Sequence, residues 1–222
     1  MDRPGAHPAL GTGIASSAGA LRMYRRHARL YDLTRWVFLR GRRRAVQGLG
    51  LSEGGRVLEI GCGTGANLLR LRGLVGSGGE VHGLDLSPQM LAVARRKVER
   101  RGWTNVHLHE GDAASFELEL GFDAVLYSYS LSMIEGWRTS LERSHAHLAP
   151  GGTLVVVDFG TMRQLGAVGR LAIRWLNYHH VDPERPYAEA MEELFGAARR
   201  EMGRLGWHFV ATAAKEEVAA GA

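Results

Sequence analysis

A glycine-rich loop with an acidic residue in front of it is the part of the sequence best suited to hold a ligand. Gly61, Gly63 and Gly65 directly follow a short apolar segment. Glycines allow a tight turn and let backbone N–H groups approach a ligand closely. Glu59 stands two residues before the first glycine, where its carboxylate would repel a pyrophosphate but suit an ammonium group. The loop therefore predicts a nucleotide-like ligand that carries an amine.

Two further acidic residues follow at informative positions. Asp85 ends the next apolar segment, about 20 residues after the loop, which is the spacing of an acceptor for ribose hydroxyls. Asp112 lies in the segment Glu-Gly-Asp-Ala, where an adenine amino group could donate to it. A ligand with ribose, adenine and an ammonium group, but no phosphate, is S-adenosylmethionine (SAM). NAD is disfavoured because of Glu59.

A run of hydroxyl side chains follows the apolar residues 123–126. It contains Tyr127, Ser128, Tyr129, Ser130 and Ser132. Alternation along a strand would send Tyr127 and Tyr129 to the same side. We therefore expect Tyr127 to Ser130 to face the SAM sulfonium and the methyl acceptor. A serine nucleophile is not expected, because no G-x-S-x-G elbow surrounds these serines.

Apolar segments that alternate with helical patterns predict a doubly wound, mostly parallel α/β sheet. Strands are expected within 54–65, 79–87, 105–113, 122–130 and 153–160, and helices over 66–74, 88–102, 137–152, 165–180 and 187–206. The tail from 207 onward offers at most one more strand, so the C-terminus looks short. Histidines such as His107 and His109 occur in pairs that match no metal-binding pattern, and no metal is expected.

The composition fits one domain, which we place at 21–222 after a disordered lead-in over 1–20. The segment 21–50 is expected to form a helical lid. Nine arginines lie between Arg22 and Arg44, with Asp32 as the only acid among them. Such a stretch is either a solvated helix face or a surface that attracts an anionic membrane. Nucleic acid is disfavoured as a partner, because the sequence contains no zinc finger or RNA-recognition motif. The single cysteine fits a cytoplasmic protein, peripheral to a membrane if the basic stretch docks there.

The segments "VLEIGCGTG", "GLDLS", "EGDA" and "LAPGGTLVVVDF" resemble, as an ordered set, the signatures of class I SAM-dependent methyltransferases. This resemblance covers about residues 55–160 and implies a Rossmann-like fold with SAM as cofactor. It implies that Glu59 and the glycine loop hold the aminocarboxypropyl end and that Asp85 binds the ribose. The adenine would lie near Met90, Asp112 and Ala113. Leu86, Tyr127 and Ser128 complete the predicted cofactor site.

A closer resemblance covers "YDLTRWVFLRGRRR", "LYSYSLSMIEGW" and "RWLNYHHVDPE". These segments are similar to betaine-lipid N-methyltransferases, which methylate the amine of a homoserine-linked lipid headgroup. The similarity implies an amine acceptor, either a lipid headgroup or a small molecule. It singles out Tyr31 in the lid, Tyr129 beside the sulfonium and His180 as candidate catalytic residues.

Two other readings keep the SAM pocket. In one, the SAM amine attacks its own γ-carbon, which gives azetidine-2-carboxylate and methylthioadenosine and needs no second substrate. A short C-terminus would suit such an enzyme. In the other, the chain binds SAM as a regulator without turnover, which the full set of pocket residues argues against.

Overall fold

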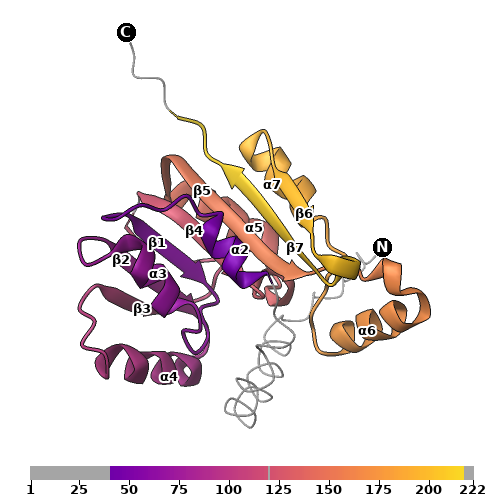
Figure 1. Cartoon of the computed structure of the whole chain (residues 1–222), viewed down its shortest axis with the longest axis horizontal. Coiled ribbons are helices and arrows are strands. Elements are labelled where there is room, and N and C mark those ends of the chain that lie inside the picture. Colours follow the sequence, from indigo (N-terminus) through magenta and orange to yellow (C-terminus); the bar gives the residue numbers. More distant parts are fainter. Residues whose placement is uncertain (1–40, 120, 218–222) are drawn as a thin grey trace, which may run out of the picture.

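Seven strands form one sheet with the order β3-β2-β1-β4-β5-β7-β6. The computed structural model describes residues 41–119 and 121–217 (Figure 1). The strands are β1 Arg56–Ile60, β2 Glu80–Asp85, β3 Val106–Glu110, β4 Phe122–Ser128, β5 Leu148–Phe159, β6 Arg199–Met202 and β7 His208–Ala214. The first five strands pair in parallel, while β7 runs antiparallel to both β5 and β6. The predicted mostly parallel, doubly wound sheet is therefore confirmed.

Helices cover both faces of this sheet. They are α2 Arg42–Gln47, α3 Leu68–Val75, α4 Pro88–Glu99, α5 Trp137–His147, α6 Gly166–Tyr178 and α7 Tyr187–Phe195, with 3₁₀ turns η1 Leu131–Met133, η2 Arg163–Leu165 and η3 Arg204–Gly206. One core cluster packs α5 and α7 against Leu58, Val125 and Val156. The other packs α2, α3 and α4 against strand residues such as Val57 and Leu126. The central strands are apolar on both faces for this reason.

The C-terminal part differs from the sequence prediction. The expected helix over 187–206 ends at Phe195, and Gly196 adopts a left-handed conformation with φ 78°. Arg199–Met202 then pairs with β7, although arginine, glutamate and methionine favour helices. Pairing with a neighbouring strand overrides this local preference. The sheet therefore gains two strands after Gly160 and its C-terminal part is not short.

One helix boundary also differs from the sequence prediction. The helix expected from Trp137, and ended by Pro150, Gly151 and Gly152, ends at His147, and β5 begins at Leu148, which pairs with Phe122. The lead-in, most of the basic stretch and most of the lid lie in residues 1–40, outside the described residues. Among the described residues, none of the helices has both the length and the apolar character needed to cross a bilayer.

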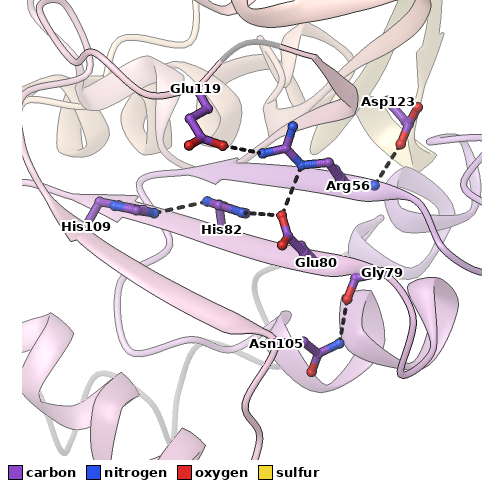
Figure 2. Close-up of polar contacts among 8 residues, drawn as sticks. All are labelled: Arg56, Gly79, Glu80, His82, Asn105, His109, Glu119 and Asp123. Carbon is purple, nitrogen blue, oxygen red and sulfur yellow. Dashed lines mark hydrogen bonds and ion pairs between the residues drawn. The ribbon is translucent and has the colours of Figure 1, made fainter.

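A polar cluster occupies the α5 and α7 side of the sheet near its β3 edge. Figure 2 shows His82 between His109, whose Nε2 lies 3.1 Å from His82 Nδ1, and Glu80, whose Oε2 lies 3.2 Å from His82 Nε2. Arg56 Nε also donates to Glu80 Oε2, at 3.0 Å. Two neutral rings satisfy this chain if His109 donates to His82 and His82 donates to Glu80. Burial, followed by the nearby His107 and His109, lowers the pKa of His82, whereas Glu80 opposes this shift.

We expect the free energy of unfolding to decrease as pH falls below about 6.5, the ordinary pKa of histidine. The reason is that His82 in the unfolded chain takes up a proton that the folded protein resists, so folding loses stability in acid. In His82→Gln this contribution is absent, and the decrease should be shallower. Urea unfolding at a series of pH values measures both slopes. Parallel slopes for the two proteins would contradict the linkage.

Candidate functional site

The parallel strands bring the predicted ligand-binding residues to one edge of the sheet. Strands β1, β2, β3 and β4 end at Ile60, Asp85, Glu110 and Ser128, and their registers align these ends. Ligands bind at this edge in open parallel sheets because the loops that follow the strands converge there. The glycine loop, the residues around Asp85, the segment after β3 and the hydroxyl run all start from it.

The glycines of the loop are required by packing within the protein. Gly61 has a φ of 68°, and a Cβ atom there would lie 2.5 Å from the Cβ of Ser130. Gly65 has a φ of 75°, and its Cβ would lie equally close to Leu68 Cδ1. Gly61 N and Cys62 N both donate to Leu84 O, at 2.8 and 3.0 Å. The loop is thus held tightly against the ends of β2 and β4.

Asp85 joins two loops through its carboxylate. Its Oδ2 accepts a hydrogen bond from Gly63 N at 2.7 Å, and its Oδ1 accepts one from Ser87 N at 2.9 Å. Ser87 in turn caps α4, because its hydroxyl accepts from Met90 N at 3.3 Å. A carboxylate oxygen can accept two hydrogen bonds. Asp85 therefore has the chemistry both to hold the glycine loop and to accept from a ligand.

Glu59 lies buried below the glycine loop. Its Oε1 accepts a hydrogen bond from Asn67 Nδ2 at 2.6 Å, and Asn67 itself is buried at the start of α3. Burial, and after it the charges of Glu59 and Asp85, raises the pKa of the Cys62 thiol well above its usual value. This end of the site is therefore acidic, and its cysteine stays a thiol.

The prediction that Tyr127 faces the cofactor is wrong. Its side chain is fully buried in the cluster beneath α5. Its hydroxyl lies 2.7 Å from the hydroxyls of both Ser140 and Ser144 and donates to Ser140 O at 2.9 Å. Burial raises the pKa of Tyr127 to about 12. Tyr127 fixes α5 to the sheet, because alternation sends this strand position to the face covered by α5 and α7.

Tyr129 points to the opposite face, because β4 ends at Ser128 and the strand alternation does not continue as far as Tyr129. The strand ends at Ser128, and Tyr129 takes a left-handed conformation with φ 56°. Its ring packs against Phe159 with centroids 4.9 Å apart, and the Arg42 guanidinium lies 5.8 Å from its centroid. Burial, and then the charge of Asp158, raises the pKa of Tyr129, which keeps its hydroxyl protonated at neutral pH. Its role in the reaction stays a prediction.

Two other hydroxyls of the run bind the protein itself. Ser130 Oγ donates to Ile60 O at 2.7 Å, which joins the ends of β4 and β1. Ser132 donates to both oxygens of Asp158, through its N–H at 3.0 Å and its hydroxyl at 2.8 Å. Burial raises the pKa of Asp158 to about 6, although its hydrogen bonds act in the other direction. These contacts fix the loop that follows β4.

Two buried polar atoms at this edge have no hydrogen-bond partner among the described residues. They are the hydroxyl oxygen of Ser128 and the amide oxygen Oδ1 of Asn67. A buried polar atom without a partner costs free energy, and a ligand can supply the missing bond. Ser128 was predicted to bind the cofactor, whereas Asn67 was not. The edge therefore fits a polar ligand that reaches both the end of β4 and the start of α3.

The remaining predicted residues fall into three groups. Leu86 is exposed beside Asp85, and Met90 is buried at the start of α4. Asp112 is exposed and accepts from Ala114 N at 2.8 Å, next to the half-buried Ala113. His180 is exposed after α6, with φ 60°, and Tyr31 lies outside the described residues. Contact of these residues with a cofactor or acceptor stays a prediction.

Sequence reasoning missed two residues that organise the site. Asn67 follows the last glycine by two positions, and Asp158 is the second-last residue of β5. An acid directly after four apolar residues was a visible signal for Asp158, because such a position borders the ligand-binding edge. Among the described residues, no group of three or more histidine, cysteine or acidic side chains is placed to hold a metal ion.

Comparison with known proteins shows that the chain is similar to methyltransferases. The family model for a methyltransferase domain matches residues 57–152. A demethylmenaquinone methyltransferase of Thermus thermophilus is 42% identical over 123 residues, 54% of each chain. One from Tropheryma whipplei is 35% identical over 161 residues, 70% of this chain and 65% of the relative. The chain thus spans about one half to two thirds of the length of these curated relatives.

Solved methyltransferases share the fold at low sequence identity. A SAM-dependent methyltransferase of Aquifex aeolicus superposes with a TM-score of 0.66 at 21% identity, over 84% of this chain and 95% of that one. A putative methyltransferase from Haloferax volcanii, solved with its Trm112 activator, gives 0.71 at 18% identity, over 92% and 97%. These likenesses show that the described chain has the class I, Rossmann-like methyltransferase fold, within which residues 57–152 match a methyltransferase domain.

Proposed function

We propose that this protein transfers the methyl group of SAM to an acceptor carried on a membrane lipid, with an amine headgroup as the first candidate. The observation that supports this most directly is the composition of the site edge. Two carboxylates, Glu59 and Asp85, flank a loop of backbone N–H groups. Such an edge suits a ligand with an amine and a ribose better than one with phosphates.

Each part of SAM has a matching group in the site. The acidic end with Glu59 and the vacant acceptor atom of Asn67 suits the SAM ammonium group. Asp85 suits the ribose hydroxyls, and we assign the adenine to the surroundings of Leu86, Met90 and Asp112. Ser128, at the end of β4, has a buried hydroxyl without a partner among the described residues, and we assign it a hydrogen bond to the ligand.

When bound, SAM supplies an electrophilic methyl group on a sulfonium. The residues of this chain act by positioning the reactants and excluding water, which accounts for most of the acceleration in such a displacement. Tyr129 keeps its proton and can donate a hydrogen bond, so it is poorly suited to serve as a base. His180 is exposed, and bulk water can take a proton from an amine there.

The curated relatives favour a second acceptor. Both relatives described above are named for demethylmenaquinone rather than for a lipid amine. A quinone of this kind is also a membrane-borne molecule, so both candidates share the requirement for access to a lipid surface. The intramolecular cyclisation of SAM has lost one of its supports, because the sheet contains both C-terminal strands.

Product analysis tests the proposal. We expect S-adenosylhomocysteine to accumulate when the protein is incubated with SAM and vesicles of an acceptor lipid, together with a methylated lipid detected by mass spectrometry. Separate incubations with a diacylglycerylhomoserine lipid, with phosphatidylethanolamine and with demethylmenaquinone identify the acceptor. Methylthioadenosine without any acceptor would instead support cyclisation. SAM binding with neither product would support the regulator.

A further prediction concerns Asp85. Asp85→Ala removes the ribose acceptor and also releases Gly63 and Ser87, so SAM affinity should weaken by about 1 to 3 kcal/mol. Asp123→Ala is a matched control, because Asp123 also accepts a backbone N–H, from Arg56 at 2.7 Å, at the opposite end of the sheet. Isothermal titration calorimetry on both folded variants should show unchanged affinity for the control. Equal affinities for the two variants would remove Asp85 from the site.

The third prediction contrasts two serines of the hydroxyl run. Ser128→Ala should leave the free energy of unfolding unchanged or slightly higher, because it removes a buried hydroxyl without a partner, yet weaken SAM binding by about 0.5 to 1.5 kcal/mol. Ser132→Ala should lower the free energy of unfolding by about 1 to 3 kcal/mol. The reason is that Asp158 loses the hydrogen bond from the Ser132 hydroxyl, and this bond also fixes the loop after β4. Urea unfolding and SAM titration on each variant distinguish the two roles, and a clear loss of stability in Ser128→Ala would contradict this assignment.

A further inference from the structure

Helix α6 carries a line of large apolar side chains on its outer face. Val168, Leu171, Trp175 and Tyr178 are 69%, 70%, 62% and 80% exposed. Their spacings of three, four and three residues place them on one side of the helix. Single exposed apolar residues are ordinary, but four in one line, two of them aromatic, mark a candidate interaction surface. We call these four residues the α6 stripe.

The opposite side of α6 is fixed to the body of the protein. Leu176 and the following Val181 are buried against Met162, with Met133 and Phe159 packed beside them. Gly169 is pressed against the carbonyl of Met162, where any Cβ would overlap that oxygen. The α6 stripe is therefore displayed on a helix whose inner face is already occupied.

The helix lies beside the ligand-binding edge. It follows β5, and Figure 1 shows it at the end toward which the parallel strands run. Asp182 N, just beyond the helix, donates to Ser132 O in the loop after β4, at 3.1 Å. Phe159, which packs against α6, also contacts Tyr129. A surface that docks on the α6 stripe is thus brought next to the loop after β4.

The charged residues around α6 indicate which kind of partner the α6 stripe contacts. Between Phe159 and Val181 the chain contains three arginines, Arg163, Arg170 and Arg174, and no acidic residue. All three arginines are exposed. Arginine side chains can extend from an apolar helix face to lipid headgroups, and tryptophan and tyrosine favour the interface between lipid and water. An amphipathic face of this composition is typical of helices that lie on anionic membranes.

Two other occupants fit the charge less well. In a twofold dimer through this single helix, the arginines of each copy would face those of the other, with no acid on α6 to pair with them. Residues 21–40 of the same chain carry six arginines against one aspartate, so this segment would bring like charge as well.

We propose that the α6 stripe, with Arg170 and Arg174, docks the protein on an anionic lipid bilayer. The inference deepens the proposed function, and its link to catalysis rests on that function: docking would bring the loop after β4 to a lipid-borne acceptor. The docking itself requires only the surface. It can therefore be measured without any methyl transfer.

Vesicle co-sedimentation of the full chain tests the docking. The wild-type protein should bind vesicles that contain phosphatidylglycerol more strongly than vesicles of phosphatidylcholine alone, and binding should weaken with salt. Leu171→Gln combined with Trp175→Gln should lower the partition coefficient by about tenfold or more. Arg170→Gln combined with Arg174→Gln should also lower it and reduce the salt dependence. Leu69→Gln is a matched control, because Leu69 is 59% exposed on α3 and lies outside the stripe.

A second measurement uses the native tryptophan. Lipids with brominated acyl chains should quench Trp175 fluorescence, and Trp175→Phe should lose most of this quenching. Absence of wild-type binding, or equal binding by the stripe variant and the wild type, would overturn the proposal. So would a dimer in light scattering that the stripe variant dissociates while vesicle binding is unaffected.

The two proposals fail in different ways. Methylation of a detergent-solubilised acceptor without vesicle binding would overturn the docking and leave the proposed function intact. Vesicle binding that depends on the α6 stripe, without S-adenosylhomocysteine formation on any acceptor, would support the docking and overturn the proposed function.

Discussion

The Asp85 carboxylate is the contact on which the shape of the site depends most. A loop of alternating glycines has few side chains with which to hold itself in place, so its conformation must come from hydrogen bonds to its backbone. The last two residues of β2 supply them: Leu84 O accepts from Gly61 and Cys62, and Asp85 accepts from Gly63 and Ser87. The loop after β1 and the start of α4 are therefore fixed to one strand end, and a ligand meets a surface that is already formed.

At the end of β4, side-chain hydroxyls hold neighbouring elements in place, as Asp85 does at the end of β2. Most hydroxyls of the run serve the fold: Tyr127 holds α5, Ser130 holds the end of β1, and Ser132 holds Asp158. A buried polar network of this kind stabilises only when its members are satisfied. Ser128 is the exception among them, because its buried hydroxyl has no hydrogen-bond partner among the described residues. The polar side chains at the end of a strand therefore have two different roles: some hold the surrounding structure in place, and others remain available to a ligand.

Much of the fold was predictable from the sequence. Buried parallel strands appear as continuous apolar segments, and helices appear as apolar residues that recur every three or four positions. The glycine loop, Glu59 and Asp85 were predictable for a related reason: their spacing follows from one strand-loop-helix unit. The sides taken by Tyr127 and Tyr129 were not, because a single left-handed residue after Ser128 reverses the alternation. Residues 199–202 were misassigned because strand pairing with β7 is a non-local contact that local helix preference does not reveal. Asn67 is a single polar residue in a helical segment and carries no pattern of its own.

The place of β6 at the border of the sheet has a consequence for self-association. A border strand exposes unpaired backbone groups, which another molecule can extend into a continuous aggregate. Here the border strand has only four residues, and three of them, Arg199, Arg200 and Glu201, are charged. Glu201 is engaged by both Arg44 and Arg199. The opposite border, β3, is also short and carries His107, His109 and Glu110. Neither border is a good template for fibril growth, so a protein that displays an apolar helix face can still resist polymerisation through its sheet.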